Sequence, residues 1–474
     1  MRANKKLLGV TVLPEFLQTE GIDAVLDNLT KAGVTAVTTS PYVMEPAEER
    51  TGVREPPDDA GAGNVRLLDR PLWVKRELFV KTAPSFEPDV RRYVGLRYQP
   101  APVADLTRRA GAVIEQFIRA AQSRHLKVYL QVQAAIPPGY RVQFGGPVDD
   151  DLPQLPDGNT PARRVSKNGS LASPHILAYL TAMLSDLLRA YPDVDGIRLD
   201  WPEYPPYFLD EVFLDFGPHA TTAGQRIGID VERMRRDTVA VYDQLHRHLT
   251  NAQLEEIVDG DGGRFGLLQL FAEYPGFADL LKLKSTLSVE LLASAKKAIV
   301  AAAGARVELV ANAFAPPWTT FSGFDFGRVG GSCQGICTKL YTMHWAMMLN
   351  FYGMALGQAN PRLDESKLVR ALVKLLDLGD DDQRTKLADY AYPEPDKPHP
   401  VSDAAIARKV RQAERVAGAT PVFALAHGYG PADDFRRRLQ AAWIASTHGV
   451  WINRYGYLSD EKLAMVKDVC EAKS

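Results

Sequence analysis

The feature that most constrains the fold is an alternation of short β-branched or apolar runs with longer stretches of helical periodicity. The runs expected to form strands are residues 7–13, 34–39, 127–135, 196–199, 307–313, 335–341, 422–427 and 449–453. Between the first two, Ile22, Val25 and Leu29 follow the spacing of one helix face, and Gly33 ends that pattern. This order is typical of βαβ units, in which helices connect parallel strands.

Eight such strands predict an α/β fold, a (β/α)8 TIM barrel with long loop insertions at its C-terminal face, formed as a single catalytic domain by residues 1–474. The main helices are expected at residues 103–123, 177–190, 230–252 and 288–303, with further helices between residues 364 and 418. An open doubly wound sheet is the alternative. That fold usually carries a glycine-rich phosphate turn after its first strand, and Leu13-Pro14-Glu15-Phe16 has no such glycines.

Two long segments interrupt the alternation, at residues 41–102 and 137–173. The first is turn-rich over residues 55–63, and its later parts, 72–82 and 93–98, are expected to pair as a hairpin. Both segments follow strands at their C-terminal ends, where the loops of a barrel build the site. We therefore expect these insertions to fold over that face and to enclose a pocket.

Charge and cysteine content narrow the class of partner. The 56 Lys and Arg residues nearly balance the 58 Asp and Glu residues, so the chain offers no strong positive field to a nucleic acid or an anionic membrane.

Of the three cysteines, Cys333 and Cys337 are expected to be buried thiols, and Cys470 leaves the number odd, which favours a reducing compartment. We find no signal peptide and no membrane-spanning run, and we expect a cytoplasmic protein. The oligomeric state stays open.

The expected strand ends carry aromatic, amide and charged side chains, beginning with Glu15 after the first strand. The predicted substrate-binding residues are Tyr42, Gln131, Gln133, Arg198, Trp201, Lys339, Tyr341, His344, His427, Asn453 and Arg454. Rings interleaved with hydrogen-bonding groups are typical of a sugar site, so a small carbohydrate is the expected substrate. No cofactor is expected, and the strand ends show no obvious cluster of metal ligands.

The densest signal is the segment from Asp195 to Pro205, which reads Asp-Gly-Ile-Arg-Leu-Asp-Trp-Pro-Glu-Tyr-Pro. Arg198 and Asp200 lie two residues apart on a strand and therefore face the same side. We expect this guanidinium to hold Asp200 ionised, as a nucleophile or charge stabiliser requires. Glu203 has apolar and aromatic neighbours, which favour the neutral form of a general acid. Two carboxyl groups tuned in opposite directions are what glycoside hydrolysis needs.

The segment also resembles the fourth strand of retaining barrel glycosidases. Asp-Gly-Ile-Arg-Leu-Asp is similar to the Asp-Gly-x-Arg-x-Asp pattern of the α-amylase superfamily, which implies Asp200 as the nucleophile and Arg198 as its partner. Read onward, it resembles the chitinase-type Asp-Gly-x-Asp-x-Asp-x-Glu signature, which implies Glu203 as the acid. Arg198 replaces an aspartate of that signature and Pro202 is inserted. The residues after the fifth strand, Phe314-Ala315-Pro316, do not match the amylase-type acid.

A second stretch adds to this likeness. Residues 168–174, the helix that follows them and residues 191–200 resemble barrel-type glycosyl hydrolases, many of them uncharacterised. The leading hypothesis is therefore a glycoside hydrolase or transglycosidase with Asp200 and Glu203 as catalytic residues and Asp325 as the next candidate acid. The alternatives are a sugar isomerase, epimerase or lyase, which would usually need a divalent metal, and a non-catalytic sugar-binding barrel. Asp200 and Asp325 also have structural interpretations, as a turn cap and as a loop-ordering residue.

Overall fold

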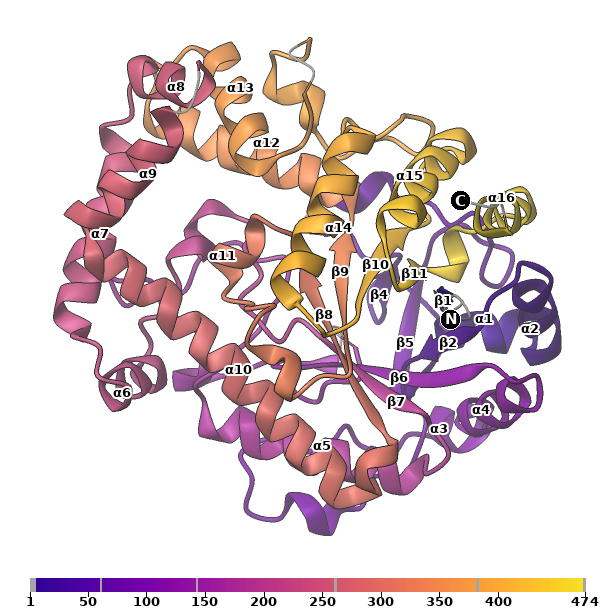
Figure 1. Cartoon of the computed structure of the whole chain (residues 1–474). Helices are drawn as coiled ribbons and strands as arrows, with labels where there is room; N and C mark the ends of the chain where they lie inside the picture. The colour runs from indigo at the N-terminus through magenta and orange to yellow at the C-terminus, as the bar shows by residue number, and fades with distance from the viewer. Residues whose placement is uncertain (1–5, 60–61, 142–143, 260–261, 381–382, 472–474) are drawn as a thin grey trace.

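A computed structural model describes residues 6–59, 62–141, 144–259, 262–380 and 383–471. Its centre is a closed barrel of eight parallel strands, which confirms the predicted TIM barrel (Figure 1). In order around the barrel these strands are β1 (Leu7–Thr11), β2 (Ala36–Thr39), β6 (Lys127–Gln133), β7 (Gly196–Asp200), β8 (Glu308–Phe314), β9 (Gly335–Leu340), β10 (Val422–His427) and β11 (Gly449–Asn453).

The helices of the described segments surround this barrel (Figure 1). They are α1 (Pro14–Thr19), α2 (Ile22–Lys31), α3 (Asp105–Ala110), α4 (Val113–Ser123), α5 (Pro174–Ala190), α6 (Pro218–Arg226), α7 (Val231–Arg247), α8 (Asn251–Val258), α9 (Gly262–Glu273), α10 (Pro275–Ala303), α11 (Trp318–Ser322), α12 (Thr342–Ala359), α13 (Glu365–Leu376), α14 (Asp403–Ala417), α15 (Ala432–Ala445) and α16 (Asp460–Glu471). Among the described residues, none of these helices is long and apolar enough to cross a membrane.

The predicted helices differ in extent from those of the structure. The helix predicted over 103–123 is divided into α3 and α4, and the one predicted over 177–190 begins at Pro174. The helix predicted over 288–303 begins earlier, at Pro275, because Leu280, Leu283 and Leu287 continue its buried face against α5 and α7. The helix predicted over 230–252 ends at Arg247, since Thr250 accepts a hydrogen bond from the Gln253 amide as the N-cap of α8.

Inward-facing side chains alternate along each strand and fill the barrel, as the two-residue period of a strand requires. One interior layer consists of Ala36, Tyr129, Val310, Cys337, Leu425 and Trp451. Gly9 makes room for this layer, since a Cβ atom there would lie 2.3 Å from the Trp451 ring. Cys333 is buried as well, which confirms the expectation for both thiols. Above this layer, the interior turns polar toward the C-terminal ends of the strands.

The segment 41–102 forms an antiparallel sheet in the order β3-β5-β4, from Tyr42–Ala47, Leu78–Pro84 and Val53–Glu55. The predicted hairpin between residues 72–82 and 93–98 is therefore wrong. β5 pairs instead with β3 and β4. Tyr93 and Tyr98 bury their rings against Tyr179 of α5, at centroid separations of 5.5 and 6.2 Å. Burial of the two rings outweighs the strand propensity of the segment.

Candidate active site

A cavity of about 930 Å³ opens at the C-terminal ends of the barrel strands. Its lining includes ten residues predicted from strand ends, namely Tyr42, Gln131, Gln133, Asp200, Trp201, Tyr341, His344, His427, Asn453 and Arg454. Both insertions contribute walls, 41–102 through Arg54, Asp59 and Arg66 and 137–173 through Arg141 and Arg164. The volume lies within the range of about 300–1,000 Å³ usual for ligand pockets.

Asp200 ends β7 on the floor of this cavity and is 9% exposed. Its Oδ1 lies 2.7 Å from the ammonium nitrogen of Lys339, on β9. That ammonium also lies 4.7 Å from the centroid of the Trp201 ring and 5.4 Å from that of Phe314. Trp201 follows the strand with a φ of 52°, which is uncommon for a bulky residue and re-aims the chain directly after Asp200. The carboxylate is thus fixed between a cation and the substrate space.

Arg198 does face the same side of β7 as Asp200, but its position differs from the one predicted. It is fully buried in the barrel interior and is not part of the cavity lining. Its guanidinium lies 4.1 Å from the centroid of the Trp451 ring and donates to Asn312 at 3.0 Å. The ionic partner of Asp200 is therefore Lys339 from β9, the second strand along from β7, and Arg198 supports the floor from below.

Glu203, the predicted general acid, lies behind the cavity wall. The side chain is fully buried, and its Oε1 accepts a hydrogen bond from the Phe314 amide at 2.8 Å. Its Oε2 accepts one from the Ser322 hydroxyl at 2.5 Å. Burial raises the pKa of Glu203 to about 7, although Lys339 opposes the shift. Burial thus favours the neutral form that was expected for Glu203. Through its two hydrogen bonds, this carboxyl also joins the end of β7 to β8 and α11.

Replacing Glu203 with glutamine is expected to change the pH dependence of stability. The pKa of Glu203 is raised from 4.5 to about 7. The proton on this carboxyl therefore contributes fully to the free energy of unfolding below pH 4.5, and that contribution is lost as pH rises through 7. Glutamine keeps the neutral form at every pH. Glu203→Gln should therefore gain unfolding free energy relative to the parent between pH 5 and pH 8, by at most about 3 kcal/mol. Denaturant unfolding curves of both proteins, recorded at pH 5 and at pH 8, measure this gain. Glu290→Gln, which changes an exposed carboxylate, should show no such gain.

Asp325, the next candidate acid, lies outside the cavity lining. Its Oδ1 accepts hydrogen bonds from the amides of Gly327 and Arg328 at 3.0 and 3.1 Å, which is the loop-ordering arrangement.

A cluster that sequence reasoning missed lies on the cavity wall, where the first insertion meets α12. Asp59 Oδ2 lies 2.9 Å from His344 Nε2 and 3.0 Å from an Arg66 nitrogen, while His344 Nδ1 is 3.3 Å from the Tyr207 hydroxyl. Burial alone would raise the pKa of Asp59, but Arg66 and His344 outweigh it and lower the value to about 2. Burial lowers the pKa of His344, and Asp59 partly offsets this. The cluster therefore pairs an ionised carboxylate with a titratable imidazole.

A second ionic cluster lies on another part of the wall, around Arg141. Its guanidinium donates to the Tyr42 hydroxyl at 2.7 Å, contacts Glu15 at 3.5 Å and pairs with Glu55. Arg454 also reaches Glu55, at 3.4 Å. Burial raises the pKa of Glu15 to about 7 against the opposing effect of Arg141. This cluster joins Glu15 of α1 to both insertions and so forms the cavity wall on that side.

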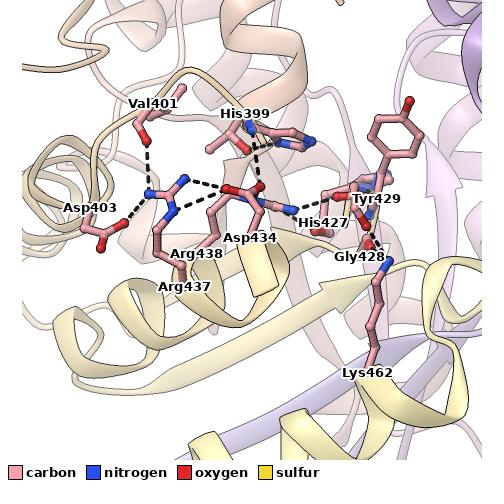
Figure 2. Close-up of polar contacts among 12 residues, drawn as sticks. His399, Val401, Asp403, His427, Gly428, Tyr429, Asp434, Arg437, Arg438 and Lys462 are labelled. Atoms are coloured by element: carbon pink, nitrogen blue, oxygen red, sulfur yellow. Dashed lines mark hydrogen bonds and ion pairs between the residues drawn. The ribbon is translucent and has the colours of Figure 1, made fainter. Parts of the chain in front are cut away.

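The C-terminal end of β10 presents His427 to the cavity, and a loop follows it. Its Nδ1 accepts a hydrogen bond from the Tyr429 amide at 3.1 Å, and burial lowers its pKa well below 6.5. The ring is therefore neutral with its proton on Nε2, a donor suited to a sugar hydroxyl. Arg438 and Lys462 fix this loop through its carbonyls, with Arg438 on those of His427 and Tyr429 and Lys462 on that of Gly428 (Figure 2).

Comparison with known proteins shows that the chain resembles solved structures in its fold alone. No protein-family model and no curated protein sequence matches the chain. Among solved structures, the catalytic domain of a β-amylase from Paenibacillus polymyxa aligns over all of both chains, with a TM-score of 0.50 and 11% identity. A β-galactosidase from the psychrophilic Marinomonas ef1 aligns over 95% of this chain and 54% of its own, at 12% identity and a TM-score of 0.49. Thus the chain spans about half the length of that enzyme. An α-L-fucosidase from Paenibacillus thiaminolyticus, covered over 49% of its length, has a TM-score of 0.46 and 10% identity.

Proposed function

We propose that this protein is a glycoside hydrolase or transglycosidase in which Asp200 is the reacting carboxylate. The observation that carries the proposal is the position of Asp200, at the end of β7 on the floor of the cavity with Lys339 2.7 Å away. Active sites of TIM barrels lie at this face. An ionised carboxylate there can attack an anomeric carbon or stabilise the positive charge that develops on the sugar ring.

The cavity lining supports a sugar as the substrate. Trp201, Tyr207 and Tyr341 contribute aromatic side chains to the cavity lining, as a site for the apolar side of a pyranose requires. Gln133, His427 and Asn453 offer amide and imidazole groups to hydroxyls. The structural neighbours named above act on sugars, as their names state, and they are consistent with this class of substrate.

Glycoside cleavage also needs a group that protonates the leaving oxygen. We assign this role to the pair of Asp59 and His344, because both line the cavity and the His344 ring nitrogens contact only side chains, those of Asp59 and Tyr207, among the described residues. Protonated His344 would be stabilised by the Asp59 carboxylate, 2.9 Å from its Nε2. Its Nδ1 would then pass a proton to the Tyr207 hydroxyl 3.3 Å away, while that hydroxyl gives its own proton to the departing oxygen. Glu203 then acts as a positioning residue behind the wall.

The walls built by both insertions favour a short glycoside over a polymer. The test is a screen of the purified chain against aryl glycosides, short oligosaccharides and polysaccharides, with and without a chelator. We expect turnover of at least one short glycoside that a chelator leaves unchanged. Turnover of a long polysaccharide at a comparable rate would contradict the enclosed site. Isomerisation or β-elimination of a free sugar, without cleavage of any glycoside, would contradict the proposed reaction.

A further inference from the structure

Four metal-ligating side chains from three separate segments meet at the outer edge of the second insertion. Asp150 and Asp151 belong to a short 3-10 turn (Asp149–Asp151), His175 is the second residue of α5, and His219 is the second residue of α6. One ligand atom from each of the four lies within 4.8 Å of all the others. Asp151 is fully buried, and the other three are partly buried.

The distances at His219 match the edges of a tetrahedral site. Its Nε2 lies 3.3 Å from Asp150 Oδ2 and 3.2 Å from Asp151 Oδ1. Zinc bonds of about 2.0–2.2 Å place tetrahedral ligand atoms about 3.3–3.6 Å apart. Nε2 is buried and, among the described residues, makes no hydrogen bond, because these two contacts lack the geometry of one. A buried nitrogen directed at two carboxylate oxygens without bonding either is the arrangement that a cation between them would complete.

Other side chains already bond to both carboxylates. The Arg97 guanidinium pairs with Asp150 Oδ1 and also lies 2.9 Å from Asp151 Oδ2. Tyr98 donates to the same Asp151 Oδ2 at 2.7 Å, and the Ser173 hydroxyl donates to Oδ1. Asp150 thus directs Oδ2 toward His219, and Asp151 directs Oδ1, which also accepts the Ser173 hydrogen bond. The outer partners fix the orientation of both carboxylates, as is usual around metal ligands.

We propose that Asp150, Asp151, His175 and His219 form a structural binding site for Zn²⁺. Two imidazoles and two carboxylates suit zinc, whereas Ca²⁺ and Mg²⁺ prefer oxygen ligands throughout. The site would tie the second insertion to α5 and α6. Tyr98 links it to the candidate active site, because its hydroxyl also accepts a hydrogen bond from the amide of Val148, a cavity-lining residue, at 3.1 Å. None of the four ligands lines that cavity, so zinc would contribute to the stability of the fold and take no part in the reaction.

The test measures zinc content and thermal stability of the full chain. Protein stripped with a chelator and then dialysed against Zn²⁺ should retain one equivalent per chain, and its melting midpoint should rise. Mg²⁺ and Ca²⁺ should leave the midpoint unchanged. The His175→Ala/His219→Ala double variant should lose the zinc and the rise. The single variant Asp150→Asn, at a half-exposed side chain, should weaken binding at least tenfold.

Two further variants complete the design. His248→Ala, on an exposed histidine at the end of α7, should retain the full equivalent of zinc. Arg97→Met removes an outer partner of both carboxylates and should weaken zinc binding by about 10–100-fold. Less than about a tenth of an equivalent in the parent, or a full equivalent in a folded double-histidine variant, would overturn the proposal.

Discussion

Replacing Asp200 with asparagine is expected to lower the turnover of a cleaved glycoside by at least about 10²–10³-fold, the loss usual when one group that stabilises transition-state charge is removed. Asparagine nearly preserves the shape of the side chain but cannot carry the charge that bonds to or stabilises the sugar cation. Steady-state kinetics with one verified substrate measure the loss. Asp105→Asn, at an exposed ion pair on α3, should turn over that substrate as the parent does.

Stability needs a separate control, because Asp200→Asn leaves the ammonium of Lys339 buried without its carboxylate. Breaking a buried ion pair from one side typically costs about 3–5 kcal/mol. The double variant Asp200→Asn/Lys339→Met removes both charges and should regain much of that free energy of unfolding without regaining turnover. Near-normal turnover by the folded single variant would show that β7 does not carry the reacting carboxylate.

The parts of the site that sequence reasoning located share one physical origin. Gln133, Asp200, His427 and Asn453 each come at the C-terminal end of a barrel strand, and the closed barrel brings those ends together. A period of two residues then determines which side chains point inward. Recognition of the eight strands was therefore sufficient to bring these residues into one cavity.

Contacts between different strands and within irregular loops could not be predicted in this way. Arg198 was chosen as the partner of Asp200 because it lies two residues away in sequence, whereas Lys339 reaches Asp200 from another strand. Glu203 follows the turn at Trp201, and the direction of that turn depends on a φ of 52° that no local pattern specifies. Asp59 lies in a turn-rich stretch without any periodicity, so only its tertiary contacts reveal its place beside His344.

The Asp59–His344 pair provides the other large expected effect. If protonated His344 delivers the proton to the leaving oxygen through the Tyr207 hydroxyl, kcat/KM should fall as pH rises through the pKa of His344, which burial places below 6.5. His344→Gln cannot donate a proton in this way. It should lower kcat/KM for an alkyl glycoside by about 10²–10⁴-fold, and the decline with rising pH should disappear.

The leaving group separates this proton delivery from a purely structural role. A nitrophenyl glycoside departs with little protonation, so His344→Gln should slow it far less than the alkyl glycoside. Asp59→Asn should show the same selectivity, since it removes the charge that stabilises the imidazolium at 2.9 Å. His248→Gln should change neither substrate's kinetics. Equal losses on both substrates, with the decline at higher pH retained, would mean that His344 only shapes the wall and that another group donates the proton.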